Sequence, residues 1–267
     1  MSEPNDMSKQ PWALILGASS GFGEATALEL AHAGMNIFGV HLDGRARAPH
    51  VAEVQERIRQ MGREVLFFNC NAADDDRRRD CVAQMTGRML DPAGTLRVIL
   101  HSLAFGALRP LAGAQEVAAR HQLELTADVM GHSLVYWVQE CLQAGMLDKG
   151  ARIFAMTSAG STRVIPNYGP VSAAKAILES HIRQLAVELA PAGITANAIL
   201  AGVTDSPALR QIPGFEKIME VAKQRNPHKR LTQPEDVARC IAALCHPATY
   251  WLNGNTLNVD GGETIVG

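Results

Sequence analysis

The amino-acid sequence predicts an α/β fold, a doubly wound parallel sheet of about seven strands flanked by helices. Short apolar runs alternate with amphipathic helical segments, and a glycine-rich turn joins the first run to the first helix. No internal repeat or low-complexity linker divides the chain. Ligands of such sheets bind beyond the carboxyl ends of the strands. We therefore expect the functional residues in the segments that directly follow the strands.

Apolar runs and turn residues give the order of the expected elements. Strands are expected over 12–17, 36–42, 64–68, 96–101, 152–157, 194–200 and 256–259. Helices are expected to end near 34, to cover 51–61 and about 74–90, to form two stretches within 113–146, to cover 168–191 and to begin again at 234. Residues 1–11 are an expected flexible tail, and 12–267 an expected single domain.

Composition narrows the class of function. Hydrophobic residues make up 47% and charged residues 19% of the chain, which is enough for a large core. The formal charge of -2 and the aromatic fraction of 5% favour small-molecule chemistry over binding to nucleic acid or a membrane surface. The five cysteines are scattered and form no CxxC, which predicts reduced thiols in the cytoplasm. No histidine spacing indicates a metal site.

A glycine-rich turn lies between the first strand and the first helix. Its spacing is GxxxGxG, from Gly17 to Gly23. Glycines let the backbone approach a pyrophosphate, and a helix N-terminus presents unpaired amides with partial positive charge. This turn predicts a dinucleotide site contacted by Gly17, Ser19, Ser20, Gly21, Phe22 and Gly23.

A phenol and an ammonium stand seven residues apart at an expected helix start, in Tyr168 and Lys175. Asn167 can cap this helix, and Pro170 is tolerated in its first turn. Residues seven apart share one stripe of a helix, so the lysine could bring the pKa of the phenol closer to neutrality. Tyr168 is therefore a candidate proton or hydrogen-bond donor. The alternative is an aromatic residue at a helix start followed by a solvated lysine.

With these motifs in place, the sequence resembles the short-chain dehydrogenase/reductase family over nearly its whole length. The resemblance also rests on Asn197-Ala198-Ile199 followed by Ala201-Gly202, and on the closing run from Asn258 to Gly262. It implies a Rossmann-like fold, a nicotinamide dinucleotide, usually a homotetramer, and a Ser/Tyr/Lys catalytic group. Ser158 occupies the position of the family serine.

Three positions depart from the usual family pattern. Valine stands at 171, where most members have the tyrosine of YxxxK; His101-Ser102-Leu103-Ala104 replaces Asn-Asn-Ala-Gly; and Met130 replaces a helix asparagine. The run IPNYGPVSAAKA resembles instead the enoyl-acyl-carrier-protein reductases, which have tyrosine, six residues and lysine. The segment from Phe105 to Pro110 resembles the branch of those enzymes that keeps an ordinary glycine turn.

This resemblance implies NAD(P)H-dependent reduction of trans-2-enoyl thioesters, with acyl carrier protein as a candidate carrier. In conjugate reduction charge develops on a thioester oxygen, further from the hydride acceptor than in ketone reduction. Moving the phenol three positions along a helix displaces it by roughly 4.5 Å, which suits that geometry. Tyr168 would then stabilise the enolate, and Lys175 would hold the nicotinamide ribose. The alternatives are a 3-oxoacyl thioester or other carbonyl reductase, favoured by Ser158, and a non-catalytic dinucleotide-binding protein.

The remaining expected cofactor contacts follow other strands. At the end of the second strand, His41 stands at the position expected for an acid; Asp43 could bind a ribose diol if the strand ends later, whereas Arg45 and Arg47 suit a 2′-phosphate. We favour NADPH, with NADH left open and solvated loop charges as the alternative. The other expected contacts are Asn71, Ala72, Ser102, Ala104, Ala201, Gly202, Val203 and Ser206.

The segment 203–230 is the expected substrate loop. Its apolar residues could form a wall for an acyl chain or pack in the core: Leu209, Ile212, Phe215, Ile218, Met219 and Val221. The basic residues Arg225, His228, Lys229 and Arg230 could meet an acidic carrier protein, although a solvated face is the favoured interpretation.

Overall fold

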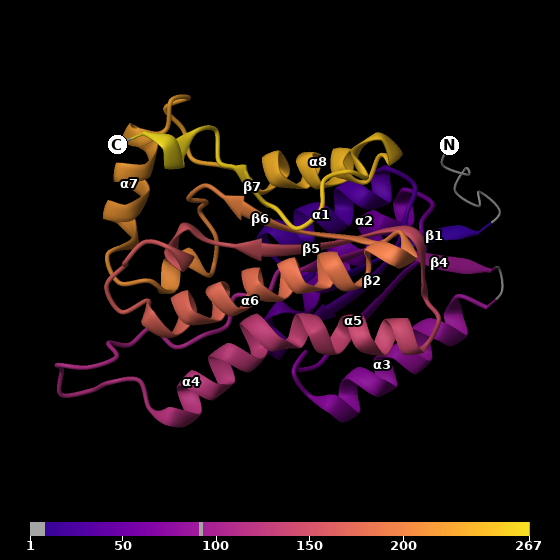
Figure 1. Ribbon diagram of the computed structural model, residues 1–267, viewed down its shortest axis with the longest axis horizontal. Coiled ribbons are helices and arrows are strands. Elements are labelled where there is room, and N and C mark those ends of the chain that lie inside the picture. The colour runs from indigo at the N-terminus through magenta and orange to yellow at the C-terminus, as the bar shows by residue number, and fades with distance from the viewer. Residues whose placement is uncertain (1–8, 91–92, 267) are drawn as a thin grey trace.

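A computed structural model describes residues 9–90 and 93–266. It contains a seven-stranded parallel sheet in the order β3-β2-β1-β4-β5-β6-β7, which confirms the predicted fold class (Figure 1). The strands are β1 (Gln10–Leu16), β2 (Asn36–His41), β3 (Val65–Asn69), β4 (Gly94–His101), β5 (Leu147–Thr157), β6 (Thr195–Ala201) and β7 (Thr256–Val259). The strand order reverses between β1 and β4, so their carboxyl ends flank the crevice in which such sheets bind ligands.

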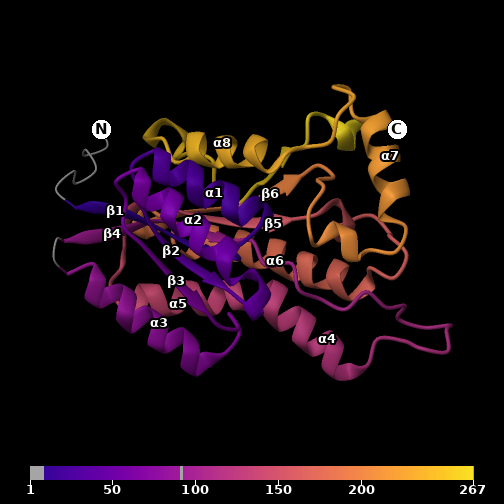
Figure 2. The ribbon, with the colours of Figure 1, turned by 180° about the vertical axis from the view of Figure 1, so that it is seen from behind.

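Helices cover both faces of the sheet (Figures 1 and 2). One face carries α1 (Gly21–His32), α2 (Ala48–Gln60) and α8 (Pro234–Leu244). The other carries α3 (Asp75–Arg88), α4 (Arg120–Ala127), α5 (Ser133–Gln143) and α6 (Gly169–Glu188). Helix α7 (Phe215–Arg225) stands beyond the carboxyl ends of β5 and β6. It therefore lies on the side of the sheet where ligands are expected.

The central strands are buried on both faces, which explains their continuous apolar runs. Along β1, Trp12, Leu14 and Leu16 point into the core on one face, and Ala13 and Ile15 into the core on the other. This alternation follows from the two-residue repeat of a strand. Apolar packing on both faces thus fixes the positions of the strands and of the segments that follow their carboxyl ends.

Several element boundaries differ from the sequence-based expectation. β1 begins at Gln10, two residues inside the predicted tail, whose residues 1–8 lie outside the described part of the chain. β5 begins at Leu147 instead of 152, because a shift in its register with β4 accommodates the polar residues before Arg152. The expected helical region from 113 becomes α4 and α5, joined by a π-helical turn over Asp128–His132.

No helix in residues 9–90 and 93–266 combines the length and the apolar character needed to cross a membrane. The five cysteines are all unpaired.

Candidate active site

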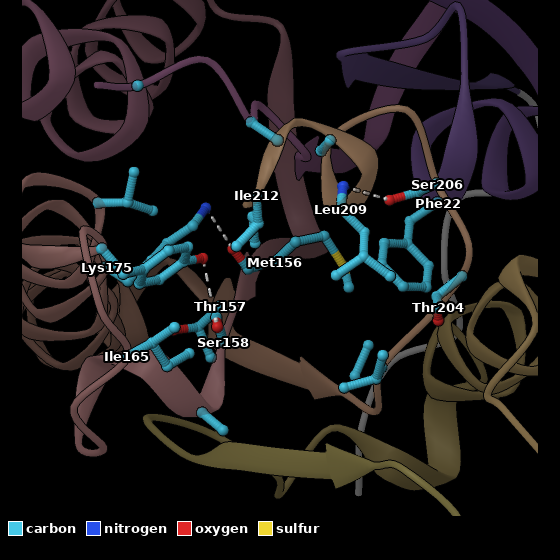
Figure 3. A pocket seen from close by; sticks show the side chains of 18 of the residues that line it. Phe22, Met156, Thr157, Ser158, Ile165, Lys175, Thr204, Ser206, Leu209 and Ile212 are labelled. Carbon is cyan, nitrogen blue, oxygen red and sulfur yellow. Dashed lines mark hydrogen bonds between the residues drawn. The ribbon is translucent and has the colours of Figure 1, made fainter. Parts of the chain in front are cut away.

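A cavity of about 600 Å³ lies at the carboxyl ends of β4, β5 and β6 (Figure 3). Its lining comes from the segments that follow these three strands, from the start of α6 and from the residues after β7. The cavity therefore lies where the parallel sheet predicts a ligand site. Of the expected catalytic and cofactor residues, it brings together Phe22, Ser102, Ala104, Ser158, Tyr168, Lys175, Ala201, Gly202, Val203 and Ser206.

Tyr168 stands immediately before α6, at the N-cap position of this helix. Asn167 adopts a left-handed conformation (φ 63°), which asparagine tolerates better than most residues and which turns the chain into the helix. The Tyr168 hydroxyl donates to Ser158 Oγ at 3.5 Å. A β-carbon on Gly160 would come within 2.5 Å of the Tyr168 ring. Gly160, which sequence analysis did not single out, thus makes room for the phenol.

Lys175 lies on α6 and is only 5% exposed. Its Nζ donates to Met156 O at 2.8 Å and to Leu103 O at 3.3 Å, so the ammonium is tied to the ends of β5 and β4 (Figure 3). Burial lowers the pKa of Lys175 to about 8. The charge is therefore held in the cavity wall at neutral pH.

The pKa of Tyr168 differs from the sequence-based expectation. Burial raises the pKa of the phenol above its ordinary value, and the Ser158 hydroxyl opposes this only in part. The ammonium of Lys175 is directed to backbone carbonyls and does not bring this pKa down. The phenol consequently keeps its proton at neutral pH, as a hydrogen-bond donor must.

The position that would hold the tyrosine of YxxxK carries an apolar residue, and its neighbours in the fold are apolar too. Val171 is buried and packs with Val129, Met130 and Ala174 in a small apolar cluster. Met130 belongs to the π-helical turn and lines the cavity. Such turns often occur at functional sites, where they redirect a side chain. Tyr168 is thus the phenol that this part of the cavity offers.

His101 lies below the cavity, in the sheet. It is fully buried, and its Nε2 lies 2.9 Å from Ser133 Oγ. Burial lowers the pKa of His101 to about 3, so the ring is neutral at physiological pH. Its neighbour Ser102 lines the cavity instead. Of this pair, Ser102 therefore lies in the cavity wall and His101 in the buried sheet.

The glycine turn has the geometry that a pyrophosphate requires. Gly17 has a φ of 96°, and a β-carbon on it would lie 2.5 Å from Ser102 O. A β-carbon on Gly23 would lie 1.9 Å from Gly17 O, so only glycine lets α1 begin so close to β1. The first turn of α1 leaves backbone N–H groups free to meet phosphate oxygens. The residues present therefore fit a dinucleotide.

In the loop after β2, the side chains of His41 and Arg47 contact the carboxylate of Asp43. His41 Nδ1 lies 2.9 Å from Asp43 Oδ2, and Arg47 Nε lies 3.3 Å from Asp43 Oδ1. Arg47 also donates from Nη2 to Ser19 O at 3.3 Å, whereas Arg45 is exposed. Arg47, and not Arg45, therefore reaches the glycine turn.

The expected adenine side lies at the end of β3. Asn71 Oδ1 accepts from the Ala73 amide at 3.0 Å, which fixes the turn after the strand. The carbonyl of Ala72 accepts from Trp137 Nε1 at 2.8 Å. These residues, like His41 and Asp43, do not line the cavity. Their contact with a cofactor stays a prediction.

The substrate loop supplies part of the cavity wall. Leu209, Ile212 and Ile218 line the cavity, whereas Phe215, Met219 and Val221 do not. Leu103, Phe105, Leu108 and Ile165 extend the apolar lining from the other side. Glu263 and Thr264, which sequence analysis missed, also line the cavity. These two residues lie far from Tyr168 in the sequence, and no sequence motif links them to it.

No group of three or more His, Cys, Asp or Glu side chains in residues 9–90 and 93–266 could hold a metal ion.

The family model described as enoyl-(acyl carrier protein) reductase matches residues 17–264. The chain belongs to this family. Among its relatives is the NADH-dependent enoyl-acyl-carrier-protein reductase of Buchnera aphidicola, which is 28% identical over 94% of each chain. The 1-cyclohexenylcarbonyl-CoA reductase of Streptomyces collinus is 30% identical, over 95% of this chain and 87% of that protein. The chain is accordingly an oxidoreductase of the enoyl-reductase type.

Solved structures of this family share the architecture. The Bacillus cereus enoyl-acyl carrier protein reductase, solved with NADP+ and indole naphthyridinone, has a TM-score of 0.85 at 25% identity and covers 97% of each chain. The Aquifex aeolicus enzyme has a TM-score of 0.82 at 24% identity, over 97% of this chain and 98% of that chain, which establishes the fold alone.

Proposed function

We propose that this protein reduces the carbon-carbon double bond of trans-2-enoyl thioesters with NADPH. The observation that carries the proposal is the placement of a protonated phenol, Tyr168, at the start of α6, with buried Lys175 two turns later and apolar Val171 between them. This arrangement displaces the donor along the helix by roughly 4.5 Å from the YxxxK position. A thioester oxygen lies correspondingly further from the carbon that accepts hydride than a ketone oxygen does.

The chain's own residues account for the stabilisation of charge. Bound NADPH would supply hydride to the β-carbon of the substrate. Tyr168 donates a hydrogen bond to the thioester oxygen as negative charge develops there, and Lys175 holds the ribose and adds positive charge nearby. A proton then reaches the α-carbon from solvent or from Tyr168. Apolar side chains of the lining, among them Leu209 and Ile212, reduce the contact of water with the reacting carbons.

Arg47 supports the preference for NADPH. Its guanidinium reaches the carbonyl of Ser19 in the glycine turn, and Asp43 is already engaged by His41 and Arg47. A guanidinium in this place suits a 2′-phosphate, whereas a free carboxylate would suit a ribose diol. Related enzymes include both an NADH and an NADPH enoyl-acyl-carrier-protein reductase.

The carrier of the acyl group is an acyl carrier protein or coenzyme A, since relatives of both kinds are similar to this chain. With acyl carrier protein, the reaction belongs to fatty acid synthesis. We also propose that the protein is a homotetramer, on family resemblance, and that it acts in the cytoplasm, because its cysteines form no disulfide.

The basic residues after α7 are used within the fold. Arg225 bonds to Val266 O and Arg230 to Asp236, which favours the solvated-face interpretation of the basic cluster.

One observation favours a second function, reduction of a 3-oxoacyl thioester. Ser158 lies within hydrogen-bond distance of the Tyr168 hydroxyl, as a carbonyl-reducing Ser/Tyr pair requires.

Paired substrates distinguish the two reactions. We expect the purified protein to oxidise NADPH with a trans-2-enoyl-CoA and not with the 3-oxoacyl-CoA of equal chain length. Tyr168→Phe should lower kcat by about 100-fold or more, because it removes a donor to developing charge. Ser158→Ala serves as the matched comparison and should cost less with the enoyl thioester. Turnover of the oxo compound alone would establish the second function instead.

A further inference from the structure

Thr157, the last residue of β5, stands between the two residues that contact the ammonium and the phenol of the site. Met156, which precedes it, accepts through its carbonyl from Lys175 Nζ at 2.8 Å (Figure 3). Ser158, which follows it, accepts from the Tyr168 hydroxyl at 3.5 Å. A group that fixes the backbone at Thr157 therefore affects both contacts.

Glu179 holds Thr157 from α6. Its Oε1 accepts from Thr157 Oγ1 at 2.5 Å. Glu179 is half-buried and lies four residues after Lys175, so the two side chains are neighbours on one stripe of the helix. Because Lys175 Nζ is directed to backbone carbonyls and Glu179 Oε1 to Thr157, their charges interact across one helical turn.

Of the described residues, Tyr168 and His101 also face Lys175, and both are uncharged at neutral pH. Burial raises the pKa of Tyr168. On β4, burial and the Lys175 ammonium lower the pKa of His101 to about 3. The negative charge of Glu179 therefore opposes the effect of burial on Lys175 and raises the pKa of that lysine.

The π-helical turn, α4 and α5 also pack against α6, and their titratable groups are paired elsewhere or exposed. The pairs are Asp128 with Tyr136, His132 with His181, Arg120 with Glu124 and Glu140 with Arg78, and the exposed groups are His121 and, on α6 itself, Arg183. Glu179 is thus the carboxylate that acts on the Lys175 ammonium in the described part of the chain.

We propose that Glu179 is a positioning residue of the site, which holds the end of β5 through Thr157 and stabilises the ammonium of Lys175 with its negative charge. Its effect on turnover rests on the proposed function, in which Lys175 holds the ribose and adds positive charge near the enolate. The two contributions are separable, because an amide in place of the carboxylate keeps the acceptor and removes the charge.

The titration of Lys175 by NMR tests the effect of the charge and needs no substrate. The chain has six lysines, so isotope-labelled lysine gives few signals, and Lys175→Arg identifies the signal of Lys175. In the wild type we expect a midpoint at the pKa of about 8. In Glu179→Gln the midpoint should fall by about 0.5 pH units or more, because the opposite charge is removed. Glu188→Gln, exposed on the same helix, is the matched control and should leave it unchanged. Equal midpoints in wild type and Glu179→Gln would overturn the inference.

Turnover of a trans-2-enoyl-CoA tests the anchoring of Thr157. At about pH 6.5, where Lys175 is charged, Glu179→Gln should keep kcat within about threefold of wild type, and its alkaline limb should begin at lower pH. Glu179→Met, which removes acceptor and charge, and Thr157→Val, which removes only the donor, should each lower kcat at that pH by about 10-fold. Equal kcat in these three variants would overturn the anchoring role. A wild type that turns over no enoyl thioester, while Glu179→Gln shows the shifted midpoint, would overturn the proposed function alone.

Discussion

At the scale of single residues, the site combines a buried lysine and a half-buried tyrosine whose environments move their pKa values in opposite directions. Burial lowers the pKa of Lys175 to about 8 and raises that of Tyr168. Both effects favour the neutral form of the group. A protonated phenol and a lysine that is charged only up to mildly alkaline pH therefore coexist in one wall of the cavity.

This pair predicts the alkaline limit of activity. As pH rises through about 8, Lys175 loses its proton and its positive charge, while Tyr168 remains protonated. We expect kcat/KM with an enoyl thioester to fall by about tenfold per pH unit above that point. In Lys175→Arg, whose side chain stays charged, any remaining activity should show no such limb. A wild-type profile that stays flat from pH 7 to pH 10 would contradict this role of Lys175.

Sequence spacing indicated Tyr168 and Lys175 as a pair, because Tyr168 directly precedes the helix that carries Lys175, and the neighbouring motifs favoured a catalytic role, which stays a prediction. The structure places both in the cavity lining. It does not support the expected effect of the lysine on the phenol, which depended on where the Lys175 ammonium points. Gly160 and Glu263 were missed because their roles arise only when distant segments meet, at the Tyr168 ring and at the Val203 amide.

At the scale of elements, the glycine turn and the loop after β2 form the cofactor side together. Alternating apolar runs predicted the strands, whereas the start of β5 and the π-helical turn after α4 were not predicted. Both depend on tertiary pairing: a register shift against β4 in the first case, and packing of Met130 beside Val171 in the second. The choice between Arg45 and Arg47 likewise required the backbone of the short helix over Arg45–Arg47.

The loop after β2 gives a prediction for cofactor choice. In Arg47→Ala we expect KM for NADPH to rise by about 10-fold or more, since one guanidinium-phosphate contact is lost, and KM for NADH to change little. Steady-state kinetics with both cofactors measures this. Arg45→Ala is the matched control and should resemble wild type, because Arg45 is exposed and lies outside the Asp43 cluster. Equal effects of the two substitutions would argue against a 2′-phosphate site at Arg47.

At the scale of the whole molecule, a core side chain contacts the turn after β3, where we expect the cofactor to bind. Trp137 on α5 is fully buried in the core and donates from Nε1 to the carbonyl of Ala72, after β3. This single bond connects the helical layer to the turn at which we expect adenine to bind. Core packing and the position of that turn are therefore linked.

Removing this bond together with the indole should lower stability, through loss of the donor and through the small cavity that the shorter ring leaves. Trp137→Phe leaves the Ala72 carbonyl without its buried donor, and we expect the free energy of unfolding in urea to fall by about 1–3 kcal/mol. The exposed Trp251 provides a control, because Trp251→Phe, at a side chain 83% exposed, should change stability by less than about 0.5 kcal/mol. Equal stability of wild type and Trp137→Phe would show that the hydrogen bond contributes nothing net.

The anchoring of residues 260–266 also has a practical side for anyone who prepares this protein. That segment forms part of the cavity wall and is tied to α7 through Arg225. Labels attached within residues 260–266 would lie next to the site and disturb the contacts that hold this segment. β1 enters the sheet at the end of the strands opposite the cavity (Figure 1). Immobilisation chemistry therefore belongs at the end of the sheet where β1 begins, away from the cavity.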